Sequence, residues 1–243
     1  MLEVDRLCVD VGGRRLLDEV SFRLEEGRIY ALIGANGSGK TSLIRALTSY
    51  YPRYGGSIRF DGKELRDCRR KERESLHALL PQVLPQLDST LDTMLSGGSP
   101  ILGQLGLEKL ALRRISSLSG GERELSFLAM MLSREARLYC LDEAEANLDA
   151  RCRRLVENAM RSLMAEGKMV LASFHDLDRA MRLSDGLLVM DAGRLVFAGD
   201  GASFASSGLA ERLFGLSRRR FTSAEGELVE LFVEVAGEDP GEV

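Results

Sequence analysis

Residues 34–41 read Gly-Ala-Asn-Gly-Ser-Gly-Lys-Thr and constrain the fold more than any other segment of the chain. They match the pattern G-x-x-x-x-G-K-[ST]. They follow an apolar run at 28–33, typical of a buried strand, and precede apolar positions at helical spacing in 40–50. Glycines let backbone N–H groups converge on phosphate oxygens, and the following helix N-terminus adds a favourable dipole. The segment predicts a phosphate-binding loop; its plain alternative is a chance glycine-rich turn.

Each residue type in this loop suits one part of a bound nucleotide. We expect Lys40 to neutralise the β- and γ-phosphates and Thr41 to ligate Mg²⁺. The other residues expected around the nucleotide are Gly34, Asn36, Gly37, Ser38, Gly39 and Ser42.

Two adjacent carboxylates follow a second apolar run, at 137–141. A buried parallel strand would deliver Asp142 to the carboxyl edge of the sheet, near the Mg²⁺ of the nucleotide, and Glu143 would polarise an attacking water. The alternative is a strand followed by the acidic N-terminus of a helix, which would show the same sequence pattern. Beside a phosphate loop, the chemical interpretation is favoured.

A second anion-binding segment is predicted at 118–122, Leu-Ser-Gly-Gly-Glu, directly before apolar residues at helical spacing. The hydroxyl of Ser119 and the free N–H groups of Gly120 and Gly121 suit an anion. The alternative is a helix N-cap and nothing more. Two such segments imply either two ligands or one ligand shared between two chains. A second Leu-Ser-Gly-Gly, at 95–98, is followed by Ser-Pro and is interpreted as a loop.

The composition excludes several classes of protein. The chain has 243 residues and a net charge of −4, with both signs interspersed, which argues against nucleic acid as the main partner. It has no apolar run of about 18 residues and no secretory pattern at its N-terminus, so we expect a cytoplasmic location. Four scattered cysteines and two histidines do not indicate a zinc site or a disulfide framework.

Strand patterns alternate with helical patterns along most of the chain, which predicts an α/β fold with a parallel sheet. Between about Leu76 and Ser133 leucine is frequent and β-branched residues are few, so a mostly helical insertion is expected there. The expected strands lie at 2–9, 20–24, 28–33, 57–60, 137–141, 169–173, 187–190 and 228–235.

Together these motifs resemble the nucleotide-binding subunit of an ATP-binding-cassette (ABC) transporter, from about residue 2 to residue 200. The resemblance implies a P-loop NTPase: a RecA-like core with a mainly parallel sheet, an N-terminal antiparallel β subdomain and a short helical subdomain. It implies a single ATPase domain at 1–235, with its core at 1–80 and 137–235, the helical subdomain at about 81–136, and a flexible acidic tail at 236–243.

The resemblance also assigns roles within one chain. Asp142 matches the Mg²⁺-associated carboxylate, Glu143 the catalytic base, and His175 the histidine that bonds the γ-phosphate. Gln82 matches the glutamine that senses Mg²⁺ and the attacking water and contacts the permease. The implied Mg²⁺ set is Thr41, Gln82 and Asp142. Val11 stands where the family usually has an aromatic residue that stacks on adenine.

Other roles act between two copies. In the family, Ser119, Gly120, Gly121 and the following Glu122 correspond to the signature segment, which caps the γ-phosphate held by the partner copy. Asp149 ends the segment 146–149, which matches the loop that signals across the dimer.

The implied function is that of an ABC importer ATPase that dimerises around two ATP with Mg²⁺ and powers a separate integral membrane permease. A substrate-binding protein would act through the permease, and the chain would lie on the cytoplasmic face of the cell membrane. Residues 91–100 and 211–215 are similar to importers for iron–siderophore, haem or cobalamin. The alternative is a soluble ABC ATPase acting on an assembly scaffold, as in iron–sulfur cluster biogenesis, which the short stretch from Gln82 to Ser119 supports.

Overall fold

The computed structural model describes residues 1–95, 99–143, 148–222 and 228–234. Over these residues, its central sheet has six strands in the order β10-β9-β3-β8-β7-β6. All run parallel except β10, which pairs antiparallel with β9 at one edge. The strands are β3 (Arg28–Ile33), β6 (His77–Leu80), β7 (Leu138–Leu141), β8 (Met169–Ser173), β9 (Gly186–Asp191) and β10 (Arg194–Gly199).

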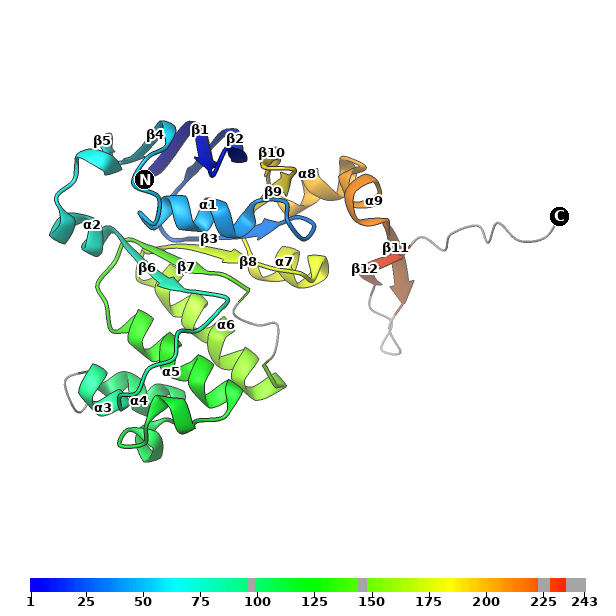
Figure 1. Ribbon diagram of the computed structural model, residues 1–243. Coiled ribbons are helices and arrows are strands. Elements are labelled where there is room, and N and C mark those ends of the chain that lie inside the picture. Colours follow the sequence, from blue (N-terminus) through cyan, green and yellow to red (C-terminus); the bar gives the residue numbers. More distant parts are fainter. Residues whose placement is uncertain (96–98, 144–147, 223–227, 235–243) are drawn as a thin grey trace.

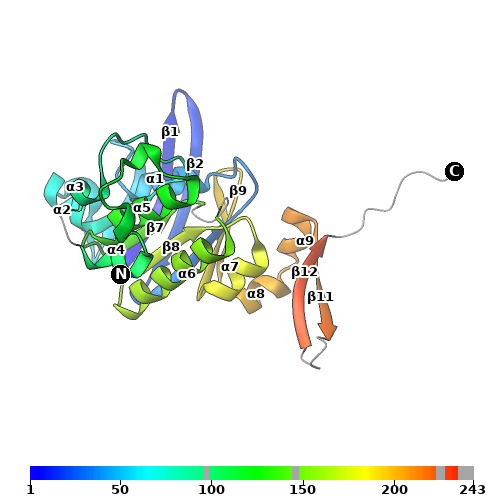
Figure 2. The same ribbon diagram turned by 90° about the horizontal axis from the view of Figure 1, so that it is seen from below.

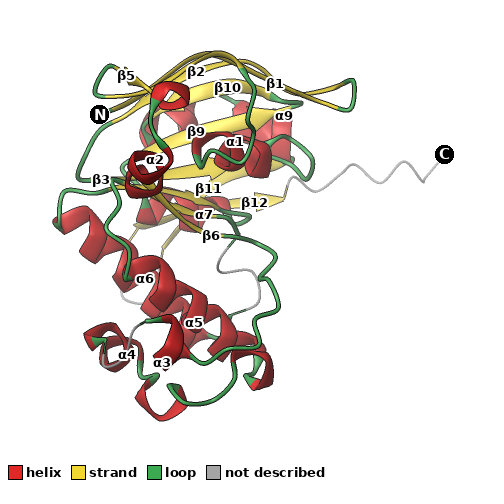
Figure 3. Ribbon diagram, turned by 60° about the vertical axis from the view of Figure 1, so that its left-hand side comes forward, coloured by secondary structure: helices red, strands yellow, loops and turns green. Residues whose placement is uncertain are grey.

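The middle strands are apolar along their length because both faces of the sheet are covered. Every residue of β7 and β8 is buried, and only Arg28 of β3 is exposed. Continuous apolar strands of this kind are typical of parallel sheets that lie between two layers. Figures 1 and 3 show helices on one face and an antiparallel sheet with α1 on the other.

The antiparallel sheet has the strand order β2-β1-β4-β5. Its apolar side chains pack with α1 (Lys40–Leu47) and one face of the central sheet in a common core. In β1 the buried positions change from even to odd numbers between Val4 and Leu7, where the register shifts and Arg6 has a φ of 45°. This bulge keeps all four buried residues of β1 on the core side, namely Leu2, Val4, Leu7 and Val9. The strands are β1 (Leu2–Val11), β2 (Arg14–Leu24), β4 (Gly55–Phe60) and β5 (Lys63–Glu64).

Helices α5 (Gly120–Leu132), α6 (Ala150–Ala165) and α7 (Leu177–Leu183) belong to the second core, on the opposite face. In α6 the buried residues Val156, Ala159, Met160 and Leu163 recur at helical spacing and form its apolar stripe. The short helices α3 and α4 lie beside α5 (Figure 1). The remaining helices are α2 (Arg70–Leu76), α3 (Leu91–Met94), α4 (Pro100–Leu105), α8 (Gly201–Ser206) and α9 (Leu209–Phe214), with 3₁₀ turns at 65–67, 108–110 and 115–117.

A two-stranded hairpin, β11 (Leu216–Thr222) with β12 (Leu228–Glu234), follows α9 and stands beside the main body (Figure 2). The Phe232 backbone N–H donates to the Asp178 carboxylate at 3.0 Å and ties the hairpin to α7. Within the described ranges, no helix has both the length and the apolar character needed to cross a bilayer.

Each predicted strand overlaps an observed one, but β5, β6, β10 and β11 were not predicted. Residues 77–80 form β6, a strand of the central sheet, although the leucine-rich texture from Leu76 onward predicted a helical insertion. A run of only four residues, His-Ala-Leu-Leu, carries no strand signature of its own, and pairing with β7 decides its structure. The predicted loop at 95–98 and the tail at 236–243 lie wholly or largely outside the described residues.

Candidate nucleotide-binding site

The loop between β3 and α1 has the backbone that its glycines make possible. Gly34 has a φ of 155°, and a Cβ there would lie 2.3 Å from the Met190 carbonyl oxygen, so glycine is required. Gly39 has a φ of 108° and gives α1 no side-chain cap, and the first turn of α1 holds no acidic residue. The N–H groups that begin α1 are therefore left to an external anion.

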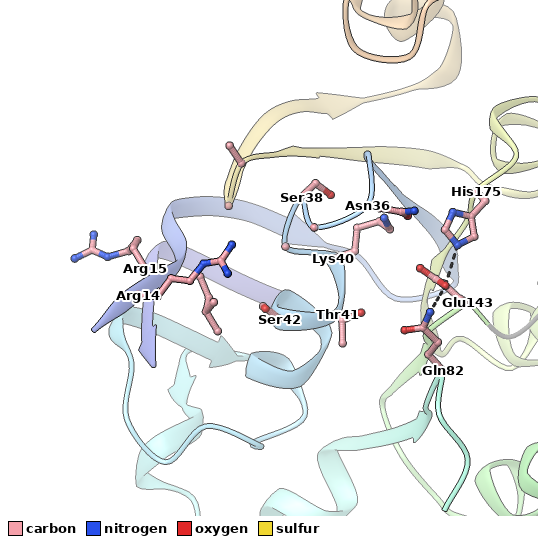
Figure 4. A pocket seen from close by; sticks show the side chains of 15 residues that line it. Arg14, Arg15, Asn36, Ser38, Lys40, Thr41, Ser42, Gln82, Glu143 and His175 are labelled. Atoms are coloured by element: carbon pink, nitrogen blue, oxygen red, sulfur yellow. Dashed lines mark hydrogen bonds and ion pairs between the residues drawn. The ribbon is translucent and has the colours of Figure 1, made fainter. Parts of the chain in front are cut away.

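This loop borders a pocket of about 630 Å³ (Figure 4). Residues that follow β6, β7, β8 and β9 also line it, which places the pocket at the carboxyl edge of the parallel strands. The lining residues are Arg14, Arg15, Leu16, Asn36, Gly37, Ser38, Gly39, Lys40, Thr41, Ser42, Gln82, Glu143, His175, Ala192 and Gly193.

Lys40 is 5% exposed. Its Nζ donates to the carbonyl oxygens of Gly34 at 2.9 Å and Ala35 at 3.2 Å. Burial lowers the pKa of Lys40, and the nearby carboxylates of Glu143 and Asp142 oppose that shift. A buried ammonium bonded to neutral carbonyls is a strong site for a phosphate, which supplies the counter-charge.

A hydrogen-bonded chain fixes the two carboxylates behind the loop. Asp142 is 3% exposed, and its Oδ1 accepts from the Ser173 hydroxyl at 2.9 Å. The Glu143 backbone N–H donates to the same hydroxyl oxygen at 2.8 Å. Glu143 has a φ of 52°, a left-handed conformation that costs energy in a residue with a side chain. The turn keeps Asp142 beneath the surface and brings Glu143 into the pocket.

The three residues predicted to take part in catalysis meet at one carboxylate oxygen. Glu143 Oε2 accepts from Gln82 Nε2 and lies 2.8 Å from His175 Nε2 (Figure 4). Gln82 follows β6 and His175 follows β8, so strands on either side of β7 position the two partners of Glu143. Ser173, which orients Glu143 from below, was missed by the sequence analysis; the only available signal was its place at the end of a predicted strand.

Other predicted residues lie elsewhere. Val11 ends β1, is 48% exposed, and is not among the described residues that line the pocket. Asp149 is the N-cap of α6, where its carboxylate accepts from the Cys152 backbone N–H at 2.7 Å. Leu148 is buried, whereas residues 146 and 147 of the same predicted loop lie outside the described ranges.

The second anion-binding segment starts α5 and is also outside this pocket. Ser119 is the N-cap, and its hydroxyl donates to Glu122 Oε2 at 2.8 Å while its backbone N–H donates to the same oxygen at 2.9 Å. These hydrogen bonds hold the pKa of Glu122 below its usual value. Gly120 and Gly121 form the first turn of the helix, and the space around a Cβ at Gly120 is open. The segment is a reciprocal capping box.

The donor set suits Mg²⁺ bound together with phosphate rather than by a protein cage. No group of three His, Cys, Asp or Glu side chains able to hold a metal occurs in the part of the chain that the structure describes. Mg²⁺ is usually held by one or two protein oxygens, substrate phosphates and water. The Thr41 hydroxyl at the start of α1, Gln82 and the buried Asp142 fit that requirement. The buried Ser38 hydroxyl has no hydrogen-bond partner among the residues that the structure describes, and it is a further polar group available to a ligand.

The comparison with known families decides the identity. The family model described as "ABC transporter" matches residues 17–146, more than half of the chain. The chain belongs to the ABC transporter family. It is therefore an ATPase of the P-loop NTPase fold, as the sequence resemblance implied.

Similar proteins support this assignment along nearly the whole chain. The hemin import ATP-binding protein HmuV of Bordetella avium is 32% identical over 88% of this chain and 92% of its own length. The phosphonates import ATP-binding protein PhnC 2 of Roseobacter denitrificans is 30% identical over 88% and 89%. The manganese transport system ATP-binding protein MntB of Bacillus subtilis is 30% identical over 81% and 85%. The solved structure of an ATP-binding subunit of an ABC transporter is 26% identical, with a TM-score of 0.75, covering 88% of this chain and 93% of that chain.

Proposed function

We propose that the chain is the ATP-hydrolysing subunit of an ABC importer, and that two copies enclose two ATP molecules to drive a separate membrane permease. The observation that carries the proposal is the Glu143 carboxylate. Gln82 and His175 hold it at one end of a pocket whose adjoining wall is the phosphate loop. A carboxylate in this place suits a base for a water that attacks a terminal phosphate.

The proposed ATP pose follows from the charges of the pocket. Lys40 and the open N–H groups at the start of α1 bind the triphosphate, with the terminal phosphate on the side of Glu143. Gly34, Asn36, Gly37, Ser38, Gly39 and Ser42 complete the cradle. The attacking water transfers its proton to Glu143 as the new P–O bond forms and the bond to the leaving diphosphate oxygen breaks. Ser173 and His175 keep the carboxylate aimed at this position.

Mg²⁺, when bound, neutralises charge on the triphosphate. We assign Thr41, Gln82 and Asp142 to hold it. Asp142 is suited to this role. The Ser173 hydroxyl donates to its Oδ1 and fixes the carboxylate beneath the pocket, while Oδ2 does not take part in that hydrogen bond.

The dimer accounts for the second anion-binding segment. Ser119, Gly120 and Gly121 lie outside the pocket of their own chain, so we assign them, with Glu122, to the terminal phosphate held by the partner copy. Asp149, exposed at the start of α6, would face the other copy. Closure on ATP is favoured because each nucleotide then binds groups of both chains.

The permease contact is assigned to the helical region at 81–136, which we propose as a subdomain distinct from the core at 1–80 and 137–235. Val83 and Leu112 are each 80% exposed there. Both side chains are thus available for contact with a partner protein. The chain would then be a peripheral protein on the cytoplasmic face of the membrane, and a substrate-binding protein would act through the permease.

Import, rather than export, is supported by the import proteins among the relatives. The cargo we propose is haem, an iron–siderophore or cobalamin, on the sequence similarity at 91–100 and 211–215 and the similarity to hemin import subunits. Relatives named for phosphonates and manganese are about as similar, so the permease has to identify the cargo.

The test of the ATPase is Glu143→Gln, with the exposed Glu211→Gln on α9 as the matched control. Removing a general base should slow hydrolysis about a hundredfold to a thousandfold while ATP still binds. The variant should also accumulate as an ATP-bound dimer, measured by light scattering. Hydrolysis by Glu143→Gln at the rate of the control would contradict the role assigned to Glu143.

The test of the partner is a detergent pull-down of the tagged chain from its own membranes, read by mass spectrometry. Stoichiometric recovery of a multi-helix membrane protein supports the importer. Recovery of soluble scaffold proteins alone would support the non-transport alternative instead.

A further inference from the structure

The nucleotide pocket has a second wall, at the start of β2, formed by Arg14, Arg15 and Leu16 (Figure 4). In the proposed pose the terminal phosphate lies between Lys40 and Glu143. The phosphate-binding residues continue from there along the pocket to Ser42 at the start of α1. The rest of the nucleotide must extend away from Glu143, so the ribose and base lie toward the start of β2. This step rests on the proposed nucleotide binding.

That wall offers no aromatic side chain to a base. No Phe, Tyr or Trp is among the described residues that line the pocket. Val11 and Arg14 are directly opposite each other in the β1–β2 ladder, joined by Gly12 and Gly13, which have φ values of 56° and 78°. Opposed residues in an antiparallel pair project from the same face of the sheet. The tight two-glycine turn thus presents Arg14 on the same face as Val11.

The two arginines at this wall differ in their partners. Arg15 Nε donates to Asp10 at 2.7 Å and its Nη1 to Asp18 at 2.7 Å, and these carboxylates raise its pKa. Arg14 has no ion pair or side-chain hydrogen bond with any residue in the described ranges. In Figure 4 its side chain extends toward the start of α1, whereas Arg15 extends away from it. Arg14 is therefore the cation at this wall that is available to a ligand.

We propose that the Arg14 guanidinium stacks on the purine base of the bound nucleotide and supplies the base contact of this site. A planar, weakly hydrated guanidinium suits the face of a base, and stacking needs no particular edge groups. The contact therefore strengthens binding of purine nucleoside triphosphates without choosing between adenine and guanine.

The experiment measures binding of ATP, GTP and inorganic tripolyphosphate by calorimetry to the wild type and three variants. Arg14→Ala removes the stacking plane, and Arg14→Tyr replaces it with a ring. Arg23→Ala, on the same strand and ion-paired with Glu3, removes an equal charge outside the pocket. Arg14→Ala should weaken ATP and GTP about fivefold and leave tripolyphosphate unchanged, because the lost contact is to the base. Arg14→Tyr should restore ATP binding, and Arg23→Ala should match the wild type.

Two results would overturn the proposal. Equal weakening of ATP and tripolyphosphate in Arg14→Ala would mean that Arg14 attracts the phosphates. Unchanged ATP binding in Arg14→Ala would mean that Arg14 makes no contact. Failure of the proposed function would look different. The wild type would then either not bind ATP, or bind it as tightly as the Lys40→Ala variant does.

Discussion

Two helices of this chain begin at segments rich in glycine and serine, yet their N-termini are in opposite states. Helix α1 begins after Gly39 with no side-chain cap and no acidic residue in its first turn, and its N–H groups border the pocket. Helix α5 begins at Ser119, and the carboxylate of Glu122 already occupies the Ser119 hydroxyl and N–H. Among the described residues, no acidic side chain caps the start of α1, whereas the Glu122 carboxylate caps the start of α5.

The difference indicates an order of binding. A phosphate meets the start of α1 without competition and gains Lys40 as a counter-charge. A phosphate at the start of α5 has to compete with the Glu122 carboxylate for the Ser119 hydroxyl. We infer that ATP first binds the phosphate loop of one copy, and that α5 of the other copy engages afterwards, when the dimer closes.

The largest effect is expected from Lys40→Ala, which removes the cation from the open terminus. ATP affinity should fall about tenfold to hundredfold, because a buried charge-assisted hydrogen bond is lost. Lys71→Ala, exposed on α2, is the control for loss of one positive charge. Calorimetric titration with ATP measures the affinity of each variant. Equal affinities of Lys40→Ala and Lys71→Ala would contradict the claim that the start of α1 is the first phosphate site.

A smaller and qualitatively different effect is expected from Ser119→Ala. Loss of this N-cap should reduce the free energy of unfolding by about 1 kcal/mol, measured with urea. ATP affinity at low protein concentration should not change, since Ser119 lies outside the pocket of its own chain. Hydrolysis at concentrations that favour the dimer should fall. If single-chain ATP affinity fell as in Lys40→Ala, Ser119 would belong to the first site.

The smallest effect is expected from Glu122→Gln, which keeps a capping side chain and removes its charge. The pKa of Glu122 is lowered in the folded chain by the Ser119 N–H and hydroxyl. Its stabilising contribution is therefore present at neutral pH and lost as the pH falls through that lowered pKa. Unfolding curves between pH 7 and pH 3 should show a loss of stability in the wild type that is reduced in Glu122→Gln. Identical pH profiles would mean that the charge of Glu122 does not stabilise α5.

Local patterns allowed the sequence to predict the first terminus well. The loop at 34–41 lies between a strand and a helix, as its glycines and neighbours indicated. The capping role of Ser119 was also predicted, as the alternative to anion binding. A capping box depends only on four consecutive residues, so it can be recognised in the sequence. Neither prediction needed knowledge of contacts between distant segments.

Contacts across the sheet could not be predicted in this way. Gln82 and Glu143 are 61 positions apart, and only the order of β6, β7 and β8 in the sheet brings them together with His175. The roles expected of Gln82 and His175 came from family resemblance, whereas that of Glu143 was also inferred from its place after a predicted strand. Ser173, which matched no motif, was missed. The strand β6 was missed for the same reason, because its four residues owe their conformation to β7.

The central claim is that each ATP site combines the phosphate loop of one copy with the α5 terminus of the other. Mixing Lys40→Ala protein with Ser119→Arg protein tests it most directly, since a mixed dimer of this kind regains one site in which both segments are intact. The account predicts that the mixture hydrolyses ATP faster than the sum of the two separate variants. A rate equal to that sum, with mixed dimers demonstrated by differential tags, would contradict it.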